Sequence, residues 1–406
     1  MNHVVVVGGG LAGLRSVEAL RARGFGGRIT LIGEEPHRPY DRPPLSKAVL
    51  LGETDSTVVD SDLDALGVET RLGVIATGLR EGTLGTSAGE VAYDGLVIAT
   101  GARPIRLPGD GPQYVLRTID DALALRAALR PRANVVIIGA GWIGAEVATA
   151  ARKAGCQVTV VEAGRAPLAP ALGATVGAFT APWYAEADIK LMLAVRVASV
   201  VPGGLTLEDG TGIEADVVVT GVGVRPAIGW LAGSGVELGD GVVVDAHLRT
   251  TMPRVVAVGD CASWWSRRFA TRMRVEHWDT ALTAPDVAAA TLLDAMGAGT
   301  GEEVVYDPVP YFWSEQFGHM VQYAGHHGGG DRDGARVILR GDPSADPKWG
   351  VCWLTGAAGE ERLTAILTVD RPRDLLQGRR VIESGRRVDP RRLADPAVML
   401  RDCTIT

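Results

Sequence analysis

The sequence predicts an α/β fold with two parallel-sheet domains, followed by a C-terminal α+β domain that contains an antiparallel sheet. Three observations support this fold class. A unit of strand, glycine-rich turn, helix and second strand begins at residue 3, and the same arrangement returns at residue 134. From about residue 306 apolar and polar residues alternate, as on strands with one solvated face. With 406 residues the chain has room for two or three domains of roughly 150 residues each.

The first unit opens with residues 3–7 (HVVVV), a β-branched run typical of a strand that is buried on both faces. A helix is expected up to about residue 22, and residues 28–35 (RITLIGEE) form the second strand of the unit. A short helix over roughly 60–66 and a strand at 93–101 complete this part of the chain.

The second unit begins with a strand of the same kind at 134–138, and its helix leads to a second strand at 157–163. Further strands are expected at 216–224 and 254–260, and a helix starts near residue 371. We therefore expect three domains, with these boundaries: 1–107 together with 235–305, then 108–234, and finally 306–406.

The composition excludes several classes of protein. A net charge of −7 argues against wholesale binding of nucleic acid or of acidic membranes. Only 22% of the residues are charged, which is too few for a disordered chain. The apolar run from Val4 to Leu14 is shorter than the about 20 residues that span a bilayer, and it lacks the features of a signal peptide. Four widely spaced cysteines fit a reducing compartment, so we expect a cytoplasmic protein.

Each unit carries the glycine spacing G-x-G-x-x-G directly after its first strand. In the first unit these glycines are Gly8, Gly10 and Gly13. The first allows a tight turn, the second lets the backbone approach a pyrophosphate, and the third lets helix and strand pack closely. The pyrophosphate then faces the free N–H groups at the start of the helix. Glu34 ends the next strand, where a carboxylate accepts hydrogen bonds from ribose hydroxyls.

The second copy consists of Gly139, Gly141 and Gly144, and Glu162 ends the strand that follows. One such motif is weak, because a packing turn has the same spacing, but two copies with correctly placed acids predict two Rossmann-like dinucleotide-binding domains. Two dinucleotides in one chain indicate FAD and NADH, with electrons passing between them. Glu162 repels a 2′-phosphate and favours NADH over NADPH. Arg165 nearby is either a partner for such a phosphate or a solvated surface residue.

Longer stretches carry the pattern of a known family: VVVGGGLAG (5–13), PYDRPPLSK (39–47), LVIATGARP (96–104), VLRTIDDA (115–122), VVIIGAGWIGAEVA (135–148), VVAVGDCA (255–262) and YFWSEQFG (311–318). In them the chain resembles, over nearly its whole length, the FAD-dependent, NADH-linked ferredoxin reductases of bacterial oxygenase and cytochrome P450 systems. This family, which includes putidaredoxin reductase and biphenyl dioxygenase ferredoxin reductase, has the glutathione-reductase-type fold. Residues 180–193 depart from its pattern.

The resemblance implies catalytic roles for Lys47 near the reactive edge of the flavin, Glu146 near the nicotinamide, and Trp313 as a lid. With the glycine turns included, the residues expected at FAD are Gly8, Gly10, Ala12, Gly13, Glu34, Arg42, Lys47, Ala76, Thr100, Gly101, Arg117, Asp260, Trp278 and Trp313. Those expected at NADH are Gly139, Gly141, Ile143, Gly144, Glu162, Gly221 and Gly223. Simpler interpretations stay open: Lys47 as an ordinary loop lysine, both tryptophans as core packing, and Asp260 as a helix cap.

The placement of cysteines narrows the chemistry. Disulfide reductases of the same fold need a cysteine after the first unit, but residues 30–60 contain none. The sequence has no C-x-x-C motif, and four scattered cysteines supply neither an iron–sulfur site nor another metal site. The electron acceptor is therefore expected to be a separate molecule, a [2Fe–2S] ferredoxin.

Ferredoxins are usually acidic, so a basic docking face is expected. Arg267, Arg268, Arg272 and Arg274 lie together without an acid, and residues 371–392 carry eight arginines against three acids. The alternative is that both segments are solvated faces without a partner. The chain itself is expected to be a monomer or homodimer that binds neither nucleic acid nor a membrane.

The leading prediction is an NADH:ferredoxin reductase, in which FAD takes hydride from NADH and passes single electrons to a ferredoxin. That ferredoxin would serve a cytochrome P450 or a Rieske-type oxygenase. A second interpretation is an NADH oxidase or quinone reductase, which reduces oxygen or a small acceptor directly. A third is an FAD-stabilised signalling or binding protein, similar to relatives of apoptosis-inducing factor, although the chain has no long insertion to carry binding elements.

Overall fold

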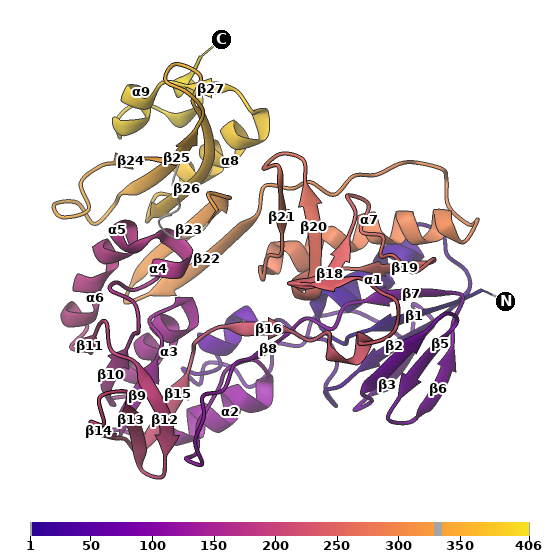
Figure 1. Ribbon diagram of the computed structural model, residues 1–406, viewed down its shortest axis with the longest axis horizontal. Coiled ribbons are helices and arrows are strands. Elements are labelled where there is room, and N and C mark those ends of the chain that lie inside the picture. The colour runs from indigo at the N-terminus through magenta and orange to yellow at the C-terminus, as the bar shows by residue number, and fades with distance from the viewer. Residues whose placement is uncertain (1, 329–334, 406) are drawn as a thin grey trace. The chain divides into compact units, whose positions relative to one another are not determined.

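The computed structural model of the protein describes residues 2–328 and 335–405. The chain folds as two compact units, each made of separate stretches of sequence, and Figure 1 labels their elements. Unit 1 contains residues 1–42, 56–103 and 224–308, and unit 2 contains residues 43–55, 104–223 and 309–406. Within the described part of the chain, no helix has both the length and the apolar character needed to cross a membrane.

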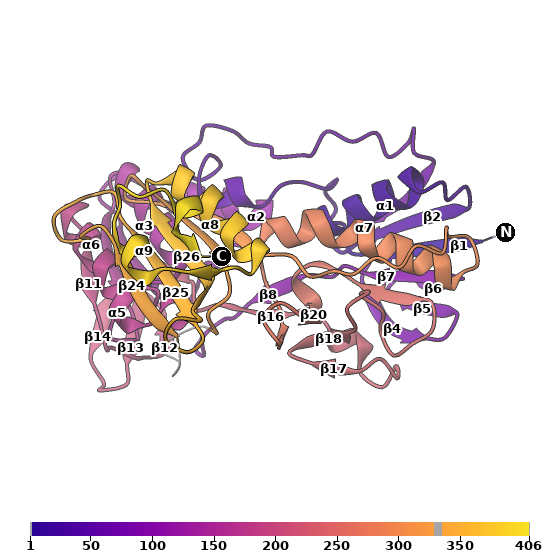
Figure 2. The same ribbon diagram turned by 90° about the horizontal axis from the view of Figure 1, so that it is seen from above.

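The centre of unit 1 is a parallel five-stranded sheet with the order β19-β7-β1-β2-β3 (Figure 1). Its strands are β1 (His3–Val7), β2 (Arg28–Gly33), β3 (Val68–Leu72), β7 (Gly95–Ile98) and β19 (Val255–Ala257). The helices α1 (Leu11–Ala22) and α7 (Trp278–Ala295) lie side by side, as Figure 2 shows. The strand–turn–helix–strand unit predicted at residue 3 is confirmed. The helix predicted over 60–66 is wrong, because residues 63–67 form a turn.

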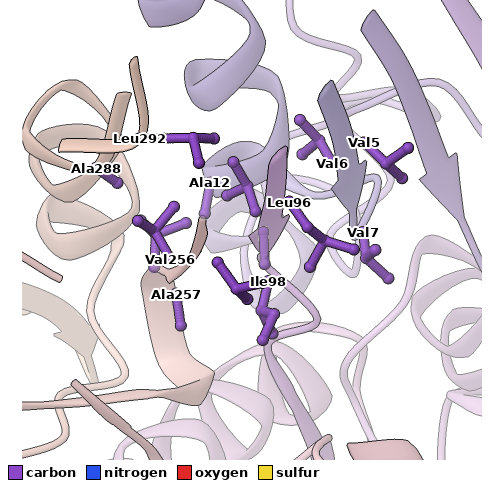
Figure 3. Close-up of a cluster of buried hydrophobic side chains, with 14 of the residues drawn as sticks. Val5, Val6, Val7, Ala12, Leu96, Ile98, Val256, Ala257, Ala288 and Leu292 are labelled. Atoms are coloured by element: carbon purple, nitrogen blue, oxygen red, sulfur yellow. The ribbon is translucent and has the colours of Figure 1, made fainter. Parts of the chain in front are cut away.

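The valine run of β1 lies in the middle of this sheet, where both of its faces are buried. Val4 is paired with Ile29 on one side and with Gly95 on the other. Figure 3 shows the core around it, which Leu292 of α7 and Val256 of β19 help to fill. Branched side chains suit a strand packed on both faces, and this explains why the run forms the central strand.

Smaller elements complete unit 1. One antiparallel sheet contains β4 (Ala76–Arg80), β5 (Thr83–Thr86) and β6 (Gly89–Ala92), and a mixed sheet contains β17 (Leu238–Gly239), β18 (Gly241–Val244), β20 (Ala262–Ser266) and β21 (Thr271–Met273). The strands β8 (Ala102–Pro104) and β16 (Val224–Pro226) pair with each other. The chain leaves unit 1 along β8 and returns to it along β16. Two short 3-10 helices are η3 (Gly229–Leu231) and η4 (Gly259–Cys261).

Unit 2 contains a second parallel sheet, with the order β11-β10-β9-β15. Its strands are β9 (Asn134–Ile138), β10 (Gln157–Val161), β11 (Lys190–Met192) and β15 (Val217–Thr220). Between β9 and β10 runs α3 (Trp142–Lys153), which confirms the second predicted unit. Around this sheet lie η1 (Pro43–Ser46), α2 (Ile119–Ala128), α4 (Ala169–Leu172), α5 (Ala174–Gly177), η2 (Ala178–Thr180), α6 (Ala181–Glu186), β12 (Val197–Val201), β13 (Gly204–Leu207) and β14 (Gly212–Glu214).

The antiparallel sheet predicted after residue 306 also belongs to unit 2. It contains β22 (Tyr311–Gln316), β23 (His319–Gly325), β24 (Arg336–Arg340), β25 (Gly350–Thr355), β26 (Arg362–Val369), β27 (Arg387–Val388) and β28 (Thr404–Ile405), beside α8 (Pro372–Ser384), α9 (Pro390–Ala394) and η5 (Leu400–Cys403). Two residues join β22 to β23: Phe317 with φ 52° and Gly318 with φ 87°. Positive φ at both positions is what a tight hairpin of type I′ requires.

Candidate functional site

The first glycine turn has the geometry of a phosphate cradle. Gly8 has φ 124°, and a Cβ atom there would lie 2.1 Å from the carbonyl oxygen of Ala99. A Cβ atom on Gly13 would lie 1.9 Å from the carbonyl oxygen of Gly8, so α1 packs this closely only with glycine. A Cβ atom on Gly10, just before α1, would lie 3.9 Å from a guanidinium nitrogen of Arg42. The start of α1 is therefore open to a ligand, as a pyrophosphate requires.

Arg42 is held beside this turn by Glu35 and Tyr40. Its guanidinium donates to Glu35 Oε1 at 2.7 Å and to Tyr40 Oη at 3.0 Å, and it lies over the Tyr40 ring. Burial lowers the pKa of Arg42, but the opposite effects of Tyr40 and Glu35 are together larger, so the pKa is raised overall. A fixed cation at the start of a helix suits a pyrophosphate. Sequence reasoning predicted Arg42 and missed the two residues that orient it.

One side-chain bond ties this segment to α7. Trp278 Nε1 donates to Asp41 Oδ1 at 2.9 Å, and the tryptophan is partly buried. The preceding residue, His277, is partly buried, and burial lowers its pKa to about 4 despite an opposing effect of Asp260. Asp260 lies inside η4 and not at its N-cap, so it does not cap that short helix.

Several residues expected at FAD follow the carboxyl ends of neighbouring parallel strands. Gly8 follows β1, Glu34 follows β2, Thr100 follows β7 and Asp260 follows β19. The carboxyl ends of parallel strands share one edge of the sheet, and this is the edge at which nucleotides bind in such folds. The order of the strands thus brings these residues to a common edge of unit 1.

The remaining predicted residues of unit 1 have varied surroundings. Glu34 is half-exposed and pairs with Arg103, with 2.6 Å between the charged atoms. Thr100 Oγ1 donates to the carbonyl oxygen of Ala227 at 2.8 Å, and the Ala227 N–H donates back to the carbonyl of Gly101 at 2.9 Å. Ala12 is buried in α1, and Ala76 is partly buried at the start of β4.

The second glycine turn repeats the first cradle inside unit 2. Gly139 has φ 100°, and a Cβ atom there would lie 2.5 Å from the carbonyl oxygen of Gly221. A Cβ atom on Gly144 would lie 2.0 Å from the carbonyl oxygen of Gly139. At Gly141 the added atom would meet no described atom within 4 Å. The space beside Gly141 is therefore free for a ligand, while the other two glycines are required by the packing of the turn itself.

Glu162 fastens this second turn. Its carboxylate accepts the N–H of Ala140 at 2.7 Å through one oxygen and the N–H of Gly164 at 2.6 Å through the other. A carboxylate has room for further bonds, so its role at a ribose stays a prediction. Near the turn, Ile143 is 42% exposed on α3, and Gly223 has φ 102°.

Arg117 also lies in unit 2, directly before the helix α2. The backbone N–H of Arg117 donates to Asp121 Oδ2 at 3.1 Å. Thr118 and Asp121 form the capping box of this helix. The contact of Arg117 with FAD that the resemblance implies stays a prediction.

Two of the residues predicted to be catalytic, Lys47 and Glu146, come together inside unit 2. Lys47 Nζ lies 2.8 Å from Glu146 Oε2, and the glutamate side chain is only 4% exposed. Ser46 also donates to Oε2, and Ser314 of β22 donates to Oε1 at 2.6 Å. The hydroxyl of Ser314 accepts a bond from Gln316 Nε2 at 3.1 Å. Three donors from two separate stretches of the chain therefore offset the cost of burying this carboxylate.

Sequence reasoning missed Ser46 and Ser314, although one signal was present. Alternation along β22 puts Ser314 and Gln316 on the same face, and both are about 1% exposed. Polar residues on a buried face need partners, so this pair indicates a polar group facing the strand. Trp313 points to the other face, where its ring stacks on that of Tyr311 with 6.0 Å between centroids.

Residues 180–193, which depart from the family pattern, pack against the tip of the β22–β23 hairpin. Trp183 stacks on His319 with 4.3 Å between ring centroids, and Tyr184 packs on Phe317 at 4.6 Å. Burial raises the pKa of Tyr184, so it remains a neutral packing group. The unusual segment thus supports the hairpin that carries Ser314.

Two of the four arginines expected to dock a ferredoxin are engaged within unit 1. Arg274 is 12% exposed and pairs with two neighbouring acids. Arg272 donates to two backbone carbonyl groups. Arg267, Arg268 and Arg272 are all exposed. Docking through these arginines stays a prediction, and Arg267 and Arg268, between β20 and β21, are the pair best suited to a test.

No group of three or more metal-binding side chains occurs among the residues that the structure describes. The four cysteines, Cys156, Cys261, Cys352 and Cys403, are buried and free. Burial raises the pKa of all four thiols, that of Cys352 to about 12. A thiol must be deprotonated to act as a nucleophile, so none of them is prepared for disulfide chemistry.

Comparison with known proteins adds to this geometry. Residues 2–284 match the family described as pyridine nucleotide-disulphide oxidoreductase, and residues 311–404 match the reductase C-terminal family. The ferredoxin–NAD(+) reductase component of the anthranilate 1,2-dioxygenase system of Burkholderia cepacia is 35% identical over 417 residues, with 98% of each chain covered.

Two solved structures align with almost the whole chain. Fdr9 has a TM-score of 0.92 and 50% identity, over 98% of this chain and 99% of its own. The covalent complex of putidaredoxin reductase with putidaredoxin has a TM-score of 0.90 and 31% identity, over 99% and 98% of the two chains. These alignments confirm the predicted fold class.

Proposed function

The chain belongs to the pyridine nucleotide-disulphide oxidoreductase family, and from that premise we propose that it is an NADH:ferredoxin reductase. FAD and NAD(H) are the cofactors of this family. The observation that carries the proposal is the combination of two open glycine cradles, at Gly10 and Gly141, with the buried pair of Lys47 and Glu146. Almost full-length similarity to a reductase component of a dioxygenase system supports it.

The residues present suit both dinucleotides. For FAD, unit 1 offers the cradle at Gly10, the fixed guanidinium of Arg42 and the strand-end acids Glu34 and Asp260. For NADH, unit 2 offers the second cradle, and the acid Glu162 favours a free 2′-hydroxyl. We assign FAD to residues 1–107 with 235–305, NADH to 108–234, and supporting contacts to 306–406.

FAD, when bound, accepts two electrons as hydride and releases them one at a time. The chain supplies the surroundings for this chemistry. Lys47 places a positive charge at the reactive edge, and Glu146, itself held by Ser46 and Ser314, fixes the position of that charge. Trp313 covers the nicotinamide side and limits the access of water.

The proposed partner is an acidic [2Fe–2S] ferredoxin that serves a Rieske-type oxygenase or a cytochrome P450. The exposed pair Arg267 and Arg268 would attract it electrostatically. We place the reaction in the cytoplasm, because the free, widely spaced cysteines fit a reducing compartment.

An anaerobic experiment tests the proposal. The purified protein should be yellow from FAD, and NADH should bleach it at least about tenfold faster than NADPH, because Glu162 repels the extra phosphate. A [2Fe–2S] ferredoxin should then restore the colour. Fast NADH consumption in air without ferredoxin would favour an oxidase or quinone reductase. Negligible turnover with every acceptor would favour a signalling protein, and a protein without FAD would overturn the whole assignment.

Docking has a test of its own. The double variant Arg267→Glu/Arg268→Glu should raise the KM for ferredoxin at least about tenfold and leave NADH–ferricyanide turnover unchanged. Arg80→Glu, at an exposed arginine on β4 of the same unit, is the matched control. An unchanged KM for ferredoxin in the double variant would rule out docking at this hairpin.

A further inference from the structure

A reductase of the proposed kind must release a proton, and the inference below rests on that proposed function. The balanced reaction is NADH + 2 ferredoxin(oxidised) → NAD⁺ + 2 ferredoxin(reduced) + H⁺. NADH gives up two electrons and one proton, while each ferredoxin takes only one electron. The proton must therefore leave from the place where the hydride arrived, and a site that excludes water needs a route for it.

Unit 2 has a cavity of about 210 Å³ that is lined by both members of the Lys47–Glu146 pair. Along α3 its lining consists of Glu146, Thr149, Ala150 and Lys153. These positions are i, i+3, i+4 and i+7, so they lie on one face of the helix. At about 1.5 Å per residue they cover about 10 Å, running away from the glycine turn at the start of α3. The volume holds several water molecules, since one occupies about 30 Å³ in the liquid.

The opposite wall carries groups that exchange protons. It includes Glu315 and His319 of the β22–β23 hairpin and Asp370, which follows β26. His319 Nδ1 lies 3.4 Å from Asp370 Oδ2, and Asp370 Oδ1 accepts the N–H of Met320 at 3.0 Å. The imidazole also stacks on Trp183, so both groups have fixed positions. Histidine is the side chain that ordinarily gains and loses protons near neutral pH.

The two walls are fastened to each other. The N–H of Phe317, at the tip of the hairpin, donates to Thr149 Oγ1 on α3 at 3.0 Å. Ser314 of the same hairpin donates to Glu146. These bonds hold the hairpin, and with it one wall of the cavity, against α3.

The charges around the cavity favour a proton over an anion. Three carboxyl groups, those of Glu146, Glu315 and Asp370, face two lysines, Lys47 and Lys153. Acids in excess raise the local concentration of cations. An anionic substrate would instead find more negative than positive groups.

We propose that this cavity is the exit route for the proton released by NADH oxidation. Lys47 passes one proton to Glu146 while taking up the single proton released at the reaction site, and Ser46 holds the carboxylate in place through its own hydrogen bond. Water in the cavity carries the proton from Glu146 to His319, which transfers it to solvent with the help of Asp370. His319 and Asp370 are thus relay residues that touch neither nucleotide.

Two substitutions remove the outer relay with little change of shape. Asp370→Asn keeps an oxygen for the Met320 N–H, and asparagine tolerates the φ of 53° at this position. His319→Phe keeps the ring that stacks on Trp183. Asp346→Asn, at an exposed aspartate of the same unit, is the matched control.

The first readout is proton release. The NADH-reduced protein is mixed with ferricyanide, which needs no docking face, and a pH-indicator dye follows the proton. In both relay variants release should be at least about tenfold slower than in the wild type and the control, and added imidazole should restore it. Reduction by NADH should not change. Release at the wild-type rate in both variants would overturn the proposal.

The second readout needs no turnover. In the resting oxidised protein, the ring resonances of His319 are compared between the wild type and Glu146→Gln at one pH. Loss of the negative charge should shift these resonances, while those of His327, just after β23, should stay in place. Unchanged His319 resonances would show that the two residues are not connected through the cavity.

The two failures are distinguishable. If NADH does not reduce the wild-type protein, the proposed function fails. If NADH reduces it normally and both relay variants release protons at the wild-type rate, only the exit route fails.

Discussion

At the residue scale, glycine meets two different needs within one turn. A Cβ atom at Gly144 would lie 2.0 Å from the carbonyl oxygen of Gly139, so the fold itself requires this glycine. A Cβ atom at Gly141 would meet no described atom within 4 Å, and a φ of −80° suits any residue. Gly141 is therefore required only if a ligand comes close to the backbone at this point.

These two glycines make a matched pair of variants. Gly141→Ala should keep the wild-type melting temperature and weaken NADH binding at least about tenfold, because the added methyl group occupies the place of the pyrophosphate. Gly144→Ala should lower the melting temperature, because α3 must move away from the turn. Calorimetry and NADH titration measure the two effects. Wild-type affinity for NADH in Gly141→Ala would contradict the assignment of the cradle.

His277 makes the stability of unit 1 depend on pH. Burial lowers its pKa in the folded protein from 6.5 to about 4. Between these values the unfolded chain binds a proton that the folded chain does not, so stability is full above pH 6.5 and falls as the pH drops toward 4. At pH 5 the loss is roughly 2 kcal/mol, at about 1.4 kcal/mol per pH unit.

The substitution His277→Gln should remove this share of the pH dependence. Thermal unfolding of the variant and the wild type at pH 7.5 and pH 5 measures it, and the wild type should lose more stability between the two values. Equal losses in both proteins would contradict a neutral, partly buried histidine.

At the scale of elements, single side-chain bonds join segments that are far apart in the sequence. In unit 1, Trp278 at the start of α7 holds Asp41, next to Arg42. In unit 2, Ser314 of β22 holds Glu146 of α3. The first bond fixes the irregular segment before Arg42 to α7, and the second fixes the buried charge of Glu146 to β22. Such bonds provide the rigidity that a binding site needs.

Loss of the bond between Trp278 and Asp41 should loosen the segment that carries Arg42. Trp278→Phe keeps an aromatic ring but removes the indole N–H, and it should weaken FAD binding about tenfold, since a hydrogen bond to a charged group is lost. Reconstitution of the FAD-free protein, followed by flavin fluorescence, measures the affinity. Trp265→Phe, at an exposed tryptophan of the same unit, is the control, and equal affinities in the two variants would contradict the role of the bond.

At the scale of the whole molecule, charge is unevenly distributed. The chain carries −7 overall, yet residues 371–392 have eight arginines against three acids, and Arg267 and Arg268 stand exposed. Local positive charge on an acidic protein attracts an acidic partner without binding polyanions in general. The same attraction weakens when salt screens it.

Salt should therefore affect the two kinds of acceptor differently. Raising the ionic strength from about 0.01 M to about 1 M should lower kcat/KM for an acidic ferredoxin at least tenfold, because the screening length falls from about 30 Å to about 3 Å. Turnover with an uncharged quinone should hardly change. The same salt dependence for both acceptors would argue against electrostatic docking.

Local patterns were sufficient to predict much of the fold. The valine run of β1 and the glycine spacings after β1 and β9 fixed both parallel units, because periodicity and φ requirements act within a few residues. The helix expected over 60–66 failed for a local reason as well. Gly67 has φ 61° and ends the helical conformation after a single turn, and the Val68 N–H then donates to the carbonyl oxygen of Leu63 at 3.0 Å.

The sequence by itself thus determined the two glycine cradles, the acids that follow the strands and the antiparallel C-terminal sheet. The tertiary structure alone decided that Ser46, Lys47, Glu146 and Ser314 form one buried cluster, and that Trp183 supports the hairpin completing it. The physical reason is distance along the chain. Glu146 lies about a hundred residues from Ser46 and still farther from Ser314, and no local propensity reports which remote donors will satisfy a buried carboxylate.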